Sequence, residues 1–399
     1  MNLRIQIFAA TLAFASALPA AVVAEGPDSL EIHHLDVGQG DATLIVARAA
    51  GDKFEAVLID GGNRSDGREI VLPYLRSLGL DRLDLVVATH FHADHIGGID
   101  EVIAGLKAPP PVFVRARGNP APPSTIQAYE LFLAAGCAPV AEAGLTLRER
   151  ARRFRPDQCD SERLFAAAEL DRLTGREPGE GRTIPLPGGA RLIAVAGNGC
   201  LIGRDGILTD CAPRAKMDEN AGSLAFVLSV GSFDYFIGGD LGGGGAGGGH
   251  LVVDLETPLS RVLGSVEVLR LSHHGSATSS NQAFLAALAP QVAVISVGDA
   301  DSRARQYRHP RRAVLARLAT LAQDDILKRV FLTNGGDRSA RAFMAARPLF
   351  DIAPGTVLVT SNGRHFTVNG QRRPTDGRAS LPAGAGPSGT DVATLETEG

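Results

Sequence analysis

The sequence predicts an α/β fold in which two β-sheets pack face to face and helices cover their outer surfaces. From residue 29 the chain alternates strand-like runs with turn signals, and a helix-like run at 68–80 leads into the apolar run LDLVVAT at 83–89. Strand-like runs return from residue 190, so the second half repeats the order of the first. With 44% hydrophobic residues among 399, the chain can bury a large core.

Each expected strand is a short run rich in apolar and β-branched residues that ends in a turn signal. In the first half these runs are 29–37, 41–49, 54–62 and 83–89. In the second half they are 190–197, 223–231, 234–240, 266–276, 291–298, 329–334 and 356–362. The loop after 83–89 therefore lies at the carboxyl end of a strand, where sites gather in α/β folds.

Three parts are expected along the chain. Residues 1–24 combine a basic start, a short apolar centre and a small-residue end, which is typical of a secretory signal peptide; an uncleaved anchor or a buried first helix is the alternative. Residues 25–370 are expected to form one domain, and residues 371–399 a disordered tail. No later run is long and apolar enough to span a membrane, so a periplasmic or secreted mature protein is expected.

The periodic pattern weakens between about 105 and 222, which predicts a long insertion carrying helices. This insertion either covers a site or forms a solvated excursion. It contains all four cysteines, Cys137, Cys159, Cys200 and Cys211. In an oxidising compartment they predict up to two disulfides with three possible pairings, whereas the lack of paired CxxC spacing argues against a zinc ribbon.

Composition gives little direct information about partners. A formal net charge of −4 and a pI near 6.2 give no global bias toward nucleic acid, although a local basic patch is compatible with both. Tryptophan is absent and aromatic residues make up 5%, so extended base-stacking platforms are not expected. The oligomeric state leaves no signal in the sequence.

The segment THFHADHIGG at 89–98 carries the strongest chemical signal. Alternate residues of an extended segment point the same way, so His90 and His92 are expected to bind one divalent ion. Asp94 and His95 then turn toward a second ion. Ten histidines in 399 residues would produce this spacing by chance on the order of a few times in ten thousand chains, so a metal site is favoured.

This motif, followed by two glycines, resembles the signature of the metallo-β-lactamase superfamily. Further motifs occur in the order found in the metallo-hydrolase domain of the ComEC-like competence DNA-uptake group: HLDVGQGDA at 34–42, LIDGG at 58–62, GGDL at 238–241, SHHGSATSS at 272–280, ISVG at 295–298 and RHP at 308–310. The resemblance covers roughly residues 29 to 370 outside the insertion. It implies a four-layer αββα metallo-β-lactamase sandwich and two divalent metal ions.

The resemblance also implies a ligand set, with Asp240 as the carboxylate that bridges the ions of the HxHxDH loop and one histidine of HHGS as a further ligand. We expect His273, because the preceding strand alternates and comparable loops in the superfamily coordinate through the histidine nearer the strand. His274 is then expected beside the ions or as a proton donor. Asp60 is expected to orient the HxHxDH loop through hydrogen bonds.

One departure concerns the first ion. Most relatives supply a third histidine between HxHxDH and the bridging aspartate, but residues 96–249 contain no histidine. The ComEC-like group shares this lack, and its asparagine-rich segment matches DENAGSL, so Asn220 and Ser223 are expected to line that position; an ordinary turn is the alternative. Without the imidazole the site becomes harder, so Mn²⁺ competes with Zn²⁺ and the identity of the metal stays open.

Two further segments are expected beside the ions. DVGQGDA supplies Asp36, Gln39 and Asp41, although these residues also suit a bare hairpin turn. SRARQYRHPRR at 302–312 places arginines around His309, which the family pattern supports. Because guanidinium groups match phosphate oxygens, Arg308 and its neighbours are expected to bind an anionic substrate; a solvated helix start is the alternative.

Together these residues predict a secreted hydrolase in which a hydroxide bridging two Zn or Mn ions attacks the substrate, with Asp94, His274 and His309 taking part in catalysis. The expected substrate is DNA or a small phosphodiester. Hydrolysis of another ester, lactone or amide is the alternative enzyme function. A catalytically weak, metal-containing binding module is the alternative outside enzymes, because a fold alone does not fix function.

Overall fold

The computed structural model describes residues 29–374 except 52, 109, 111, 116–163, 167–182, 203–207, 213–216, 248–249, 300–307 and 354. The predicted signal peptide, Cys137, Cys159 and residues 375–399 of the predicted tail lie outside the described residues. Within the described ranges, no helix is both long and apolar enough to cross a bilayer.

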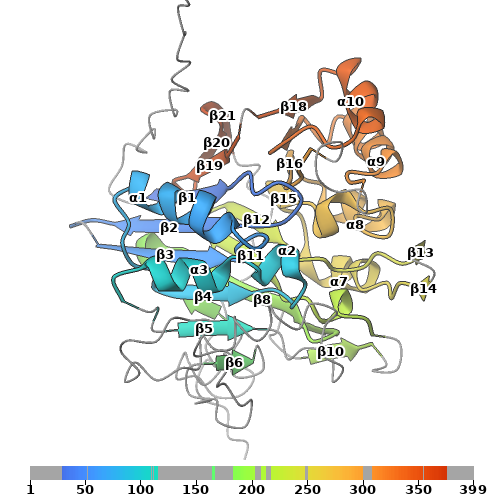
Figure 1. Ribbon diagram of the computed structural model, residues 1–399. Coiled ribbons are helices and arrows are strands. Elements are labelled where there is room, and N and C mark those ends of the chain that lie inside the picture. The colour runs from blue at the N-terminus through green and yellow to red at the C-terminus, as the bar shows by residue number, and fades with distance from the viewer. Residues whose placement is uncertain are drawn as a thin grey trace, which may run out of the picture.

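Two mixed sheets pack face to face between helices, which confirms the predicted αββα sandwich (Figure 1). The first sheet has the order β21-β20-β19-β1-β2-β3-β4-β5-β6. Its strands are β1 (Ser29–His34), β2 (Thr43–Ala49), β3 (Lys53–Ile59), β4 (Leu85–Ala88), β5 (Val112–Arg115), β6 (Leu164–Ala166), β19 (Val357–Ser361), β20 (His365–Val368) and β21 (Gln371–Pro374).

The second sheet has the order β10-β9-β8-β11-β12-β15-β16-β17-β18, and β7 also pairs with β8. Its strands are β7 (Thr183–Pro185), β8 (Arg191–Gly197), β9 (Cys200–Ile202), β10 (Leu208–Cys211), β11 (Ala225–Val230), β12 (Phe233–Ile237), β15 (Val268–Arg270), β16 (Val292–Ile295), β17 (Arg329–Leu332) and β18 (Phe350–Ile352). A separate hairpin consists of β13 (Ala246–Gly247) and β14 (His250–Leu251).

Helices cover both outer faces of the sandwich (Figure 1). On the first sheet these are η1 (Gly67–Val71), α1 (Leu72–Ser77), α2 (Ala93–Ile96) and α3 (Ile99–Gly105). On the second they are α7 (Glu256–Leu263), α8 (Gln282–Leu288), α9 (Arg312–Gln323) and α10 (Arg338–Ala345). Short 3₁₀ turns are η5 (Pro187–Gly189), η7 (Asn220–Gly222) and η8 (Ser272–Gly275).

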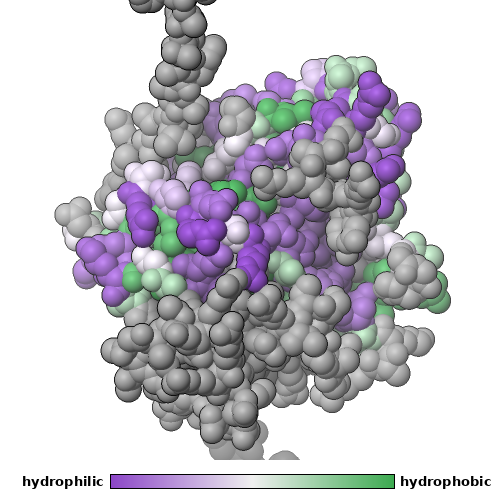
Figure 2. Space-filling model, in the orientation of Figure 1, coloured by the Kyte–Doolittle hydropathy of each residue, from purple (hydrophilic) through white to green (hydrophobic). Residues whose placement is uncertain are grey.

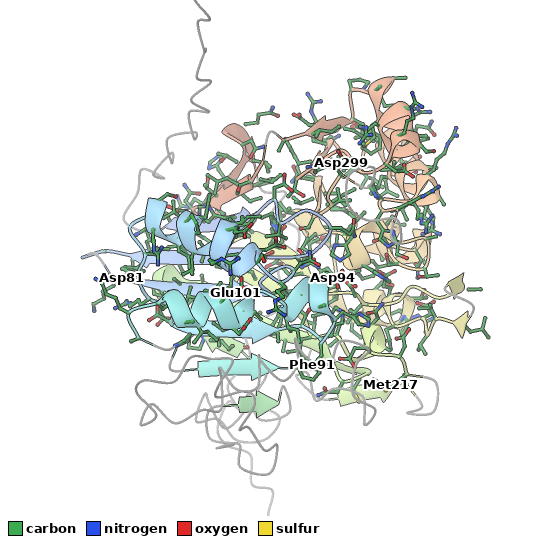
Figure 3. The ribbon with its side chains drawn as sticks, viewed as in Figure 1. Asp81, Phe91, Asp94, Glu101, Met217 and Asp299 are labelled. Carbon is green, nitrogen blue, oxygen red and sulfur yellow. The ribbon has the colours of Figure 1, made fainter. Side chains whose placement is uncertain are left out.

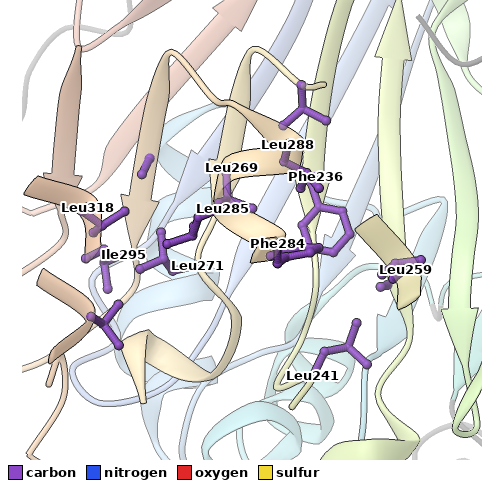
Figure 4. Packing of buried hydrophobic residues seen from close by; sticks show 14 of the residues in the cluster. Phe236, Leu241, Leu259, Leu269, Leu271, Phe284, Leu285, Leu288, Ile295 and Leu318 are labelled. Carbon is purple, nitrogen blue, oxygen red and sulfur yellow. The ribbon is translucent and has the colours of Figure 1, made fainter. Parts of the chain in front are cut away.

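The core has one layer between the sheets and one beneath each set of helices. In β2, Ile45 faces the layer between the sheets, whereas Leu44 and Val46 face the layer under α1 and α3. Figure 4 shows the third layer, where Phe236 of the second sheet packs against Phe284 of α8. Strands buried on both faces read as continuous apolar runs, which is why they are visible in the sequence. Hydrophilic side chains cover much of the outer surface of α9 and α10 (Figure 2).

The region predicted as an insertion contributes strands where it is described. β5 and β6 extend the first sheet in parallel pairing, and β7 to β10 extend the second. The segments expected to form helices lie mainly outside the described residues, and the strands that are described complete the sheet edges. In the pairing of β9 and β10, Cys200 lies opposite Cys211. At the other end of the domain, Gln371–Pro374 forms a strand rather than the start of a tail.

Candidate metal centre

The predicted metal ligands lie just beyond the carboxyl ends of strands, at one edge of the sandwich. His90 follows β4, Asp240 follows β12, and His273 and His274 follow β15. Parallel pairing of β3 with β4, and of β12 with β15, aligns the loops within each sheet. Asp94 lies on α2, facing the space between the two halves (Figure 3). Three segments that are distant in sequence therefore meet at this edge.

One group of side chains, which we name the inner subsite, consists of Asp94, His95, Asp240 and His274. Asp240 Oδ1 lies 3.2 Å from His95 Nε2 and 3.8 Å from His274 Nε2. His274 Nε2 lies 3.5 Å from Asp94 Oδ2. The contact between His95 and Asp240 is not aligned as a hydrogen bond, and these buried Nε2 and Oδ1 atoms have no hydrogen-bond partner. Converging imidazole nitrogen and carboxylate oxygen atoms of this kind fit a divalent cation.

Contacts behind the inner subsite fix the orientation of its imidazoles. Asp60, buried at the end of β3, accepts a hydrogen bond from His95 Nδ1 at 2.7 Å. Thr89 donates to the same carboxylate through its backbone N–H at 2.8 Å and its hydroxyl at 2.7 Å. His274 Nδ1 donates to the carbonyl of Ser296 at 3.0 Å. Each Nε2 is thereby presented to the site, and Asp60 lies where its predicted orienting role requires.

The charges of the inner subsite depend on one another. Burial alone would lower the pKa of His95, but the carboxylates of Asp240 and Asp60 raise it well above its usual value. Burial alone would raise the pKa of Asp240, but His95, His273 and His274 hold it well below its usual value. Burial opposes ionisation of Asp94 as well, but the neighbouring imidazoles of His274 and His95 lower its pKa. A metal ion must displace the proton of His95, so metal binding should weaken at low pH.

A second group, the outer subsite, consists of His90, His92 and the other oxygen of Asp240. His90 Nε2 lies 3.0 Å from His92 Nδ1 and 3.7 Å from Asp240 Oδ2. Burial lowers the pKa of His90 well below its usual value, which keeps the imidazole neutral and able to bind metal. The structure thus brings together the two histidines expected to share an ion, and Asp240 faces both subsites.

His273, the expected ligand of the second ion, and its neighbour His274 approach different oxygens of Asp240. His274 is 1% exposed and approaches both Asp94 and Asp240 Oδ1, whereas His273 Nε2 approaches Asp240 Oδ2 at 3.6 Å. Strand alternation does not continue through these residues, because both have left-handed backbone conformations, with φ of 51° and 53°. By these distances His274 lies in the inner subsite, and His273 lies beside the oxygen of Asp240 that faces the outer subsite.

The predicted lining residues have different surroundings. Ser223 Oγ accepts a hydrogen bond from the backbone N–H of Asp240 at 3.1 Å, which positions the shared carboxylate. Asn220 Nδ2 lies 3.5 Å from both ring nitrogens of His273. The carboxylate of Asp36 instead accepts hydrogen bonds from Gly38 N at 3.2 Å and Asn334 Nδ2 at 3.2 Å. It therefore stabilises the turn of the DVGQGDA segment.

The other residues of this turn are buried or partly buried. Gln39 has buried side-chain nitrogen and oxygen atoms without a hydrogen-bond partner. Its backbone packs so closely on Gly298 that a side chain there would lie 2.3 Å from Gln39 N. Asp41 is fully buried, and its backbone N–H donates to the carbonyl of Asp94 at 3.0 Å. The turn is therefore attached to the ligand loop and is not a free hairpin.

Sequence analysis missed Arg270, the fully buried last residue of β15. Its Nη2 lies 2.5 Å from Asp41 Oδ2 and donates to the carbonyl of Gly239 at 3.1 Å. Asp41 Oδ2 in turn lies 3.9 Å from His274 Nδ1. The pattern of a buried strand gave no reason to expect a charge here. The signal that could have indicated it is an arginine inside an otherwise apolar run.

His309 lies beside both histidines of η8. It is 4% exposed, and its ring centroid is 5.4 Å from that of His273 and 6.4 Å from that of His274. Burial, with the nearby charges of His273 and His274, lowers its pKa to about 3, so its imidazole is neutral. Arg308 is exposed next to it, whereas Arg303 and Arg305 lie outside the described residues.

The chain is similar to several known proteins. A curated relative, ComE operon protein 3 of Bacillus subtilis (strain 168), is 22% identical over 304 residues, which are 71% of this chain and 30% of that protein. The chain thus spans less than a third of that relative's length. A diphosphatase from the PhnP family shares 14% identity, with coverage of 84% of this chain and 98% of that chain and a TM-score of 0.35. YhfI from Bacillus subtilis, a metallo-beta-lactamase fold protein, shares 11% identity, with coverage of 84% and 100% and a TM-score of 0.36.

The family comparison concerns the site residues themselves. The profile of the metallo-beta-lactamase superfamily matches residues 35–183, a range that begins just before DVGQGDA and includes the whole HxHxDH loop. The matched range includes Asp41, His90, His92 and His95, whereas Asp240 and His274, which complete the cluster, lie beyond it. This chain thus has a metallo-beta-lactamase fold, and its residues 35–183, which carry part of the buried His/Asp cluster, are similar to the metallo-beta-lactamase superfamily.

Proposed function

We propose that this chain is a two-metal phosphodiesterase that acts on an anionic diester such as single-stranded DNA or a small phosphodiester. The observation that carries the proposal is the position of the basic segment 308–312. The backbone N–H of Arg311 donates to the carbonyl of Gly275 at 2.9 Å, directly after the two histidines of η8. The exposed side chains of Arg308 and Arg311 therefore start from a backbone that is attached to the ligand turn. Guanidinium groups bind phosphate oxygens in pairs, whereas a neutral lactam requires no such group.

Each group of side chains has a different role in the proposed reaction. When bound, two divalent ions supply a nucleophile from water at neutral pH and positive charge for the reacting oxygens. Asp60 and Ser296 hold the inner imidazoles in their ligand orientations. His309, neutral and next to η8, has one ring N–H with which it can donate a hydrogen bond to an oxygen of the substrate. The arginines orient the diester by its charge.

Export is part of the same proposal. Residues 1–24 have the pattern of a signal peptide, and the opposed positions of Cys200 and Cys211 suit a cross-strand disulfide. Such bonds persist in oxidising compartments such as the periplasm. Mass spectrometry of exported protein should find an N-terminus near Glu25 and no alkylatable thiol without reductant. An intact Met1, or four alkylated cysteines, would contradict export with oxidised cysteines.

The substrate is tested by comparing turnover numbers. With Mn²⁺, bis-nitrophenyl phosphate or single-stranded DNA should be cleaved faster than any β-lactam, lactone or carboxylic ester is with Zn²⁺. His309→Ala should lower the diester rate by about 10²-fold, the usual effect of losing one hydrogen-bond donor to the reacting oxygens, and leave the metal content unchanged. His365→Ala, which removes an imidazole from β20, is the matched control. Faster lactam turnover, or metal loss in His309→Ala, would contradict the assignment.

A further inference from the structure

The two subsites differ in how many donors the chain supplies. The inner subsite has His95, Asp240 and His274 together with the nearby carboxylates of Asp41 and Asp94, whereas the outer subsite has His90, His92 and a single oxygen of Asp240. Residues 96–249 contain no histidine that could complete the outer set. A further imidazole donor must therefore come from outside that range.

The turn η8 places one such group beside the outer subsite. His273 Nε2 lies 3.6 Å from Asp240 Oδ2, the same oxygen that lies 3.7 Å from His90 Nε2. His274 Nε2 instead lies 3.8 Å from Asp240 Oδ1. Two consecutive imidazoles thus approach opposite oxygens of one carboxylate. Their rings are 6.3 Å apart and inclined by 70°, so they are directed to different places.

The backbone of this turn explains the divergence. Consecutive left-handed residues are uncommon for side chains larger than glycine, because Cβ crowds the carbonyl oxygen, and such conformations cluster at functional sites. In a strand, His273 and His274 would point to opposite faces of the sheet, and only one could reach the site. With φ of 51° and 53°, both reach Asp240. Gly275, with φ of 77°, continues the same left-handed path.

We propose that His273 is the third protein donor of the outer subsite and replaces the imidazole that residues 96–249 lack. Asn220 supports this role, because its amide lies 3.5 Å from the ring nitrogens of His273 and its Oδ1 is buried without a hydrogen-bond partner. Since amide orientation is interchangeable at this contact, Oδ1 can accept the ring N–H that metal binding leaves free and so orient the imidazole. The inference rests on the metal binding of the proposed function and not on its substrate.

Stepwise metal affinities test the proposal. Dissociation constants for Mn²⁺ and Zn²⁺ would be measured by competition with a chromophoric chelator, for wild type and for single and paired variants. His273→Ala should weaken one ion at least about ten-fold and leave the other unchanged. Adding His92→Ala, which damages the outer subsite independently, should leave the tightly bound ion in place. Adding His274→Ala, which damages the inner subsite, should weaken both ions.

The outcomes separate this inference from others. His309→Ala is the matched control, because it removes a neighbouring imidazole and should keep both affinities. Unchanged affinities in His273→Ala, with a lower reaction rate, would assign this side chain to the substrate and overturn the proposal. Loss of both ions in the His92→Ala/His273→Ala pair, with one ion kept in His273→Ala/His274→Ala, would place it in the inner subsite. Normal metal affinities with no diester cleavage would instead overturn the proposed substrate. Circular dichroism of every variant confirms that it is folded.

Discussion

The inner and outer subsites share Asp240 but are supported differently. In the inner subsite each imidazole has a fixed contact behind it, His95 with Asp60 and His274 with the carbonyl of Ser296. In the outer subsite His92 is only partly buried, and the side chain of His273 is 21% exposed. Donors that are oriented before binding lose less entropy when the ion arrives. We therefore expect the inner subsite to hold its ion more tightly, and the outer one to exchange its ion and meet the substrate.

The largest expected effect comes from Asp240, the residue common to both subsites. Asp240→Ala should bind at most one ion and lose at least about 10³-fold in turnover, because both ions lose a ligand and their charges lose the carboxylate between them. Metal analysis by mass spectrometry and diester turnover would measure this. Asp240→Asn, which keeps one oxygen, should retain more metal than Asp240→Ala. If Asp240→Ala still bound two ions at wild-type affinity, Asp240 would not be a ligand shared by the inner and outer subsites.

Local spacing made much of this site predictable. The apolar run of β4 predicted that His90 and His92 leave a strand together, and the left-handed Asp60 follows β3 just as its motif suggested. The order of strands across each sheet was not predictable in this way, because short strands such as β5 and β6 carry little periodic signal. Their pairing is decided by tertiary contacts.

Two features of the site could not be predicted from the sequence: the backbone conformation of η8 and the ion pair between residues that are distant in the chain. Alternation assigned His273 to the second ion because it assumes a continued strand, and nothing in the spacing of SHHGS encodes two left-handed residues. The sequence did not indicate an ion-pair partner for Arg270. In the structure, Asp41 Oδ2 lies 2.5 Å from its Nη2. A buried charge is stable only with its partner, and this partner comes from the first sheet.

The second prediction concerns that buried pair, which supports the inner subsite from the interior of the sandwich. Arg270→Met should lower the free energy of unfolding of the metal-free protein by about 3–5 kcal/mol, because it leaves the carboxylate of Asp41 buried without compensation. Urea unfolding with chelator present would measure this. Metal affinity should fall more in the inner subsite, since Asp41 lies 3.9 Å from His274.

A double variant separates charge from packing in this experiment. Asp41→Asn/Arg270→Met removes both charges and should be more stable than Arg270→Met alone. If the double variant is instead less stable by the sum of the single effects, the two side chains do not act as a pair. Equal losses of metal affinity at both subsites in Arg270→Met would show that the Arg270–Asp41 pair supports the two subsites equally.

The smallest expected effect concerns Glu256, which holds the segment after η8. This fully buried carboxylate accepts hydrogen bonds from the backbone N–H groups of Ser280 at 2.7 Å and Asn281 at 2.8 Å. Burial raises its pKa to about 7, from an ordinary value of 4.5, although these hydrogen bonds oppose the shift. Between those pH values the folded protein keeps a proton that the unfolded chain has lost. The free energy of unfolding should therefore decrease as pH rises through this window, by up to about 3 kcal/mol.

Glu256→Gln should remove this pH dependence, because the amide does not titrate. Urea unfolding of the chelated protein at pH 5, 6, 7 and 8 would compare wild type with Glu256→Gln, and Asp254→Asn, an exposed carboxylate nearby, controls for general charge effects. Parallel pH profiles for wild type and Glu256→Gln would show that Glu256 does not titrate in this range. Because the anchored segment follows both His273 and His274, any change in metal affinity should affect the two subsites equally. This response would differ from that of Arg270→Met, whose effect should fall mainly on the inner subsite.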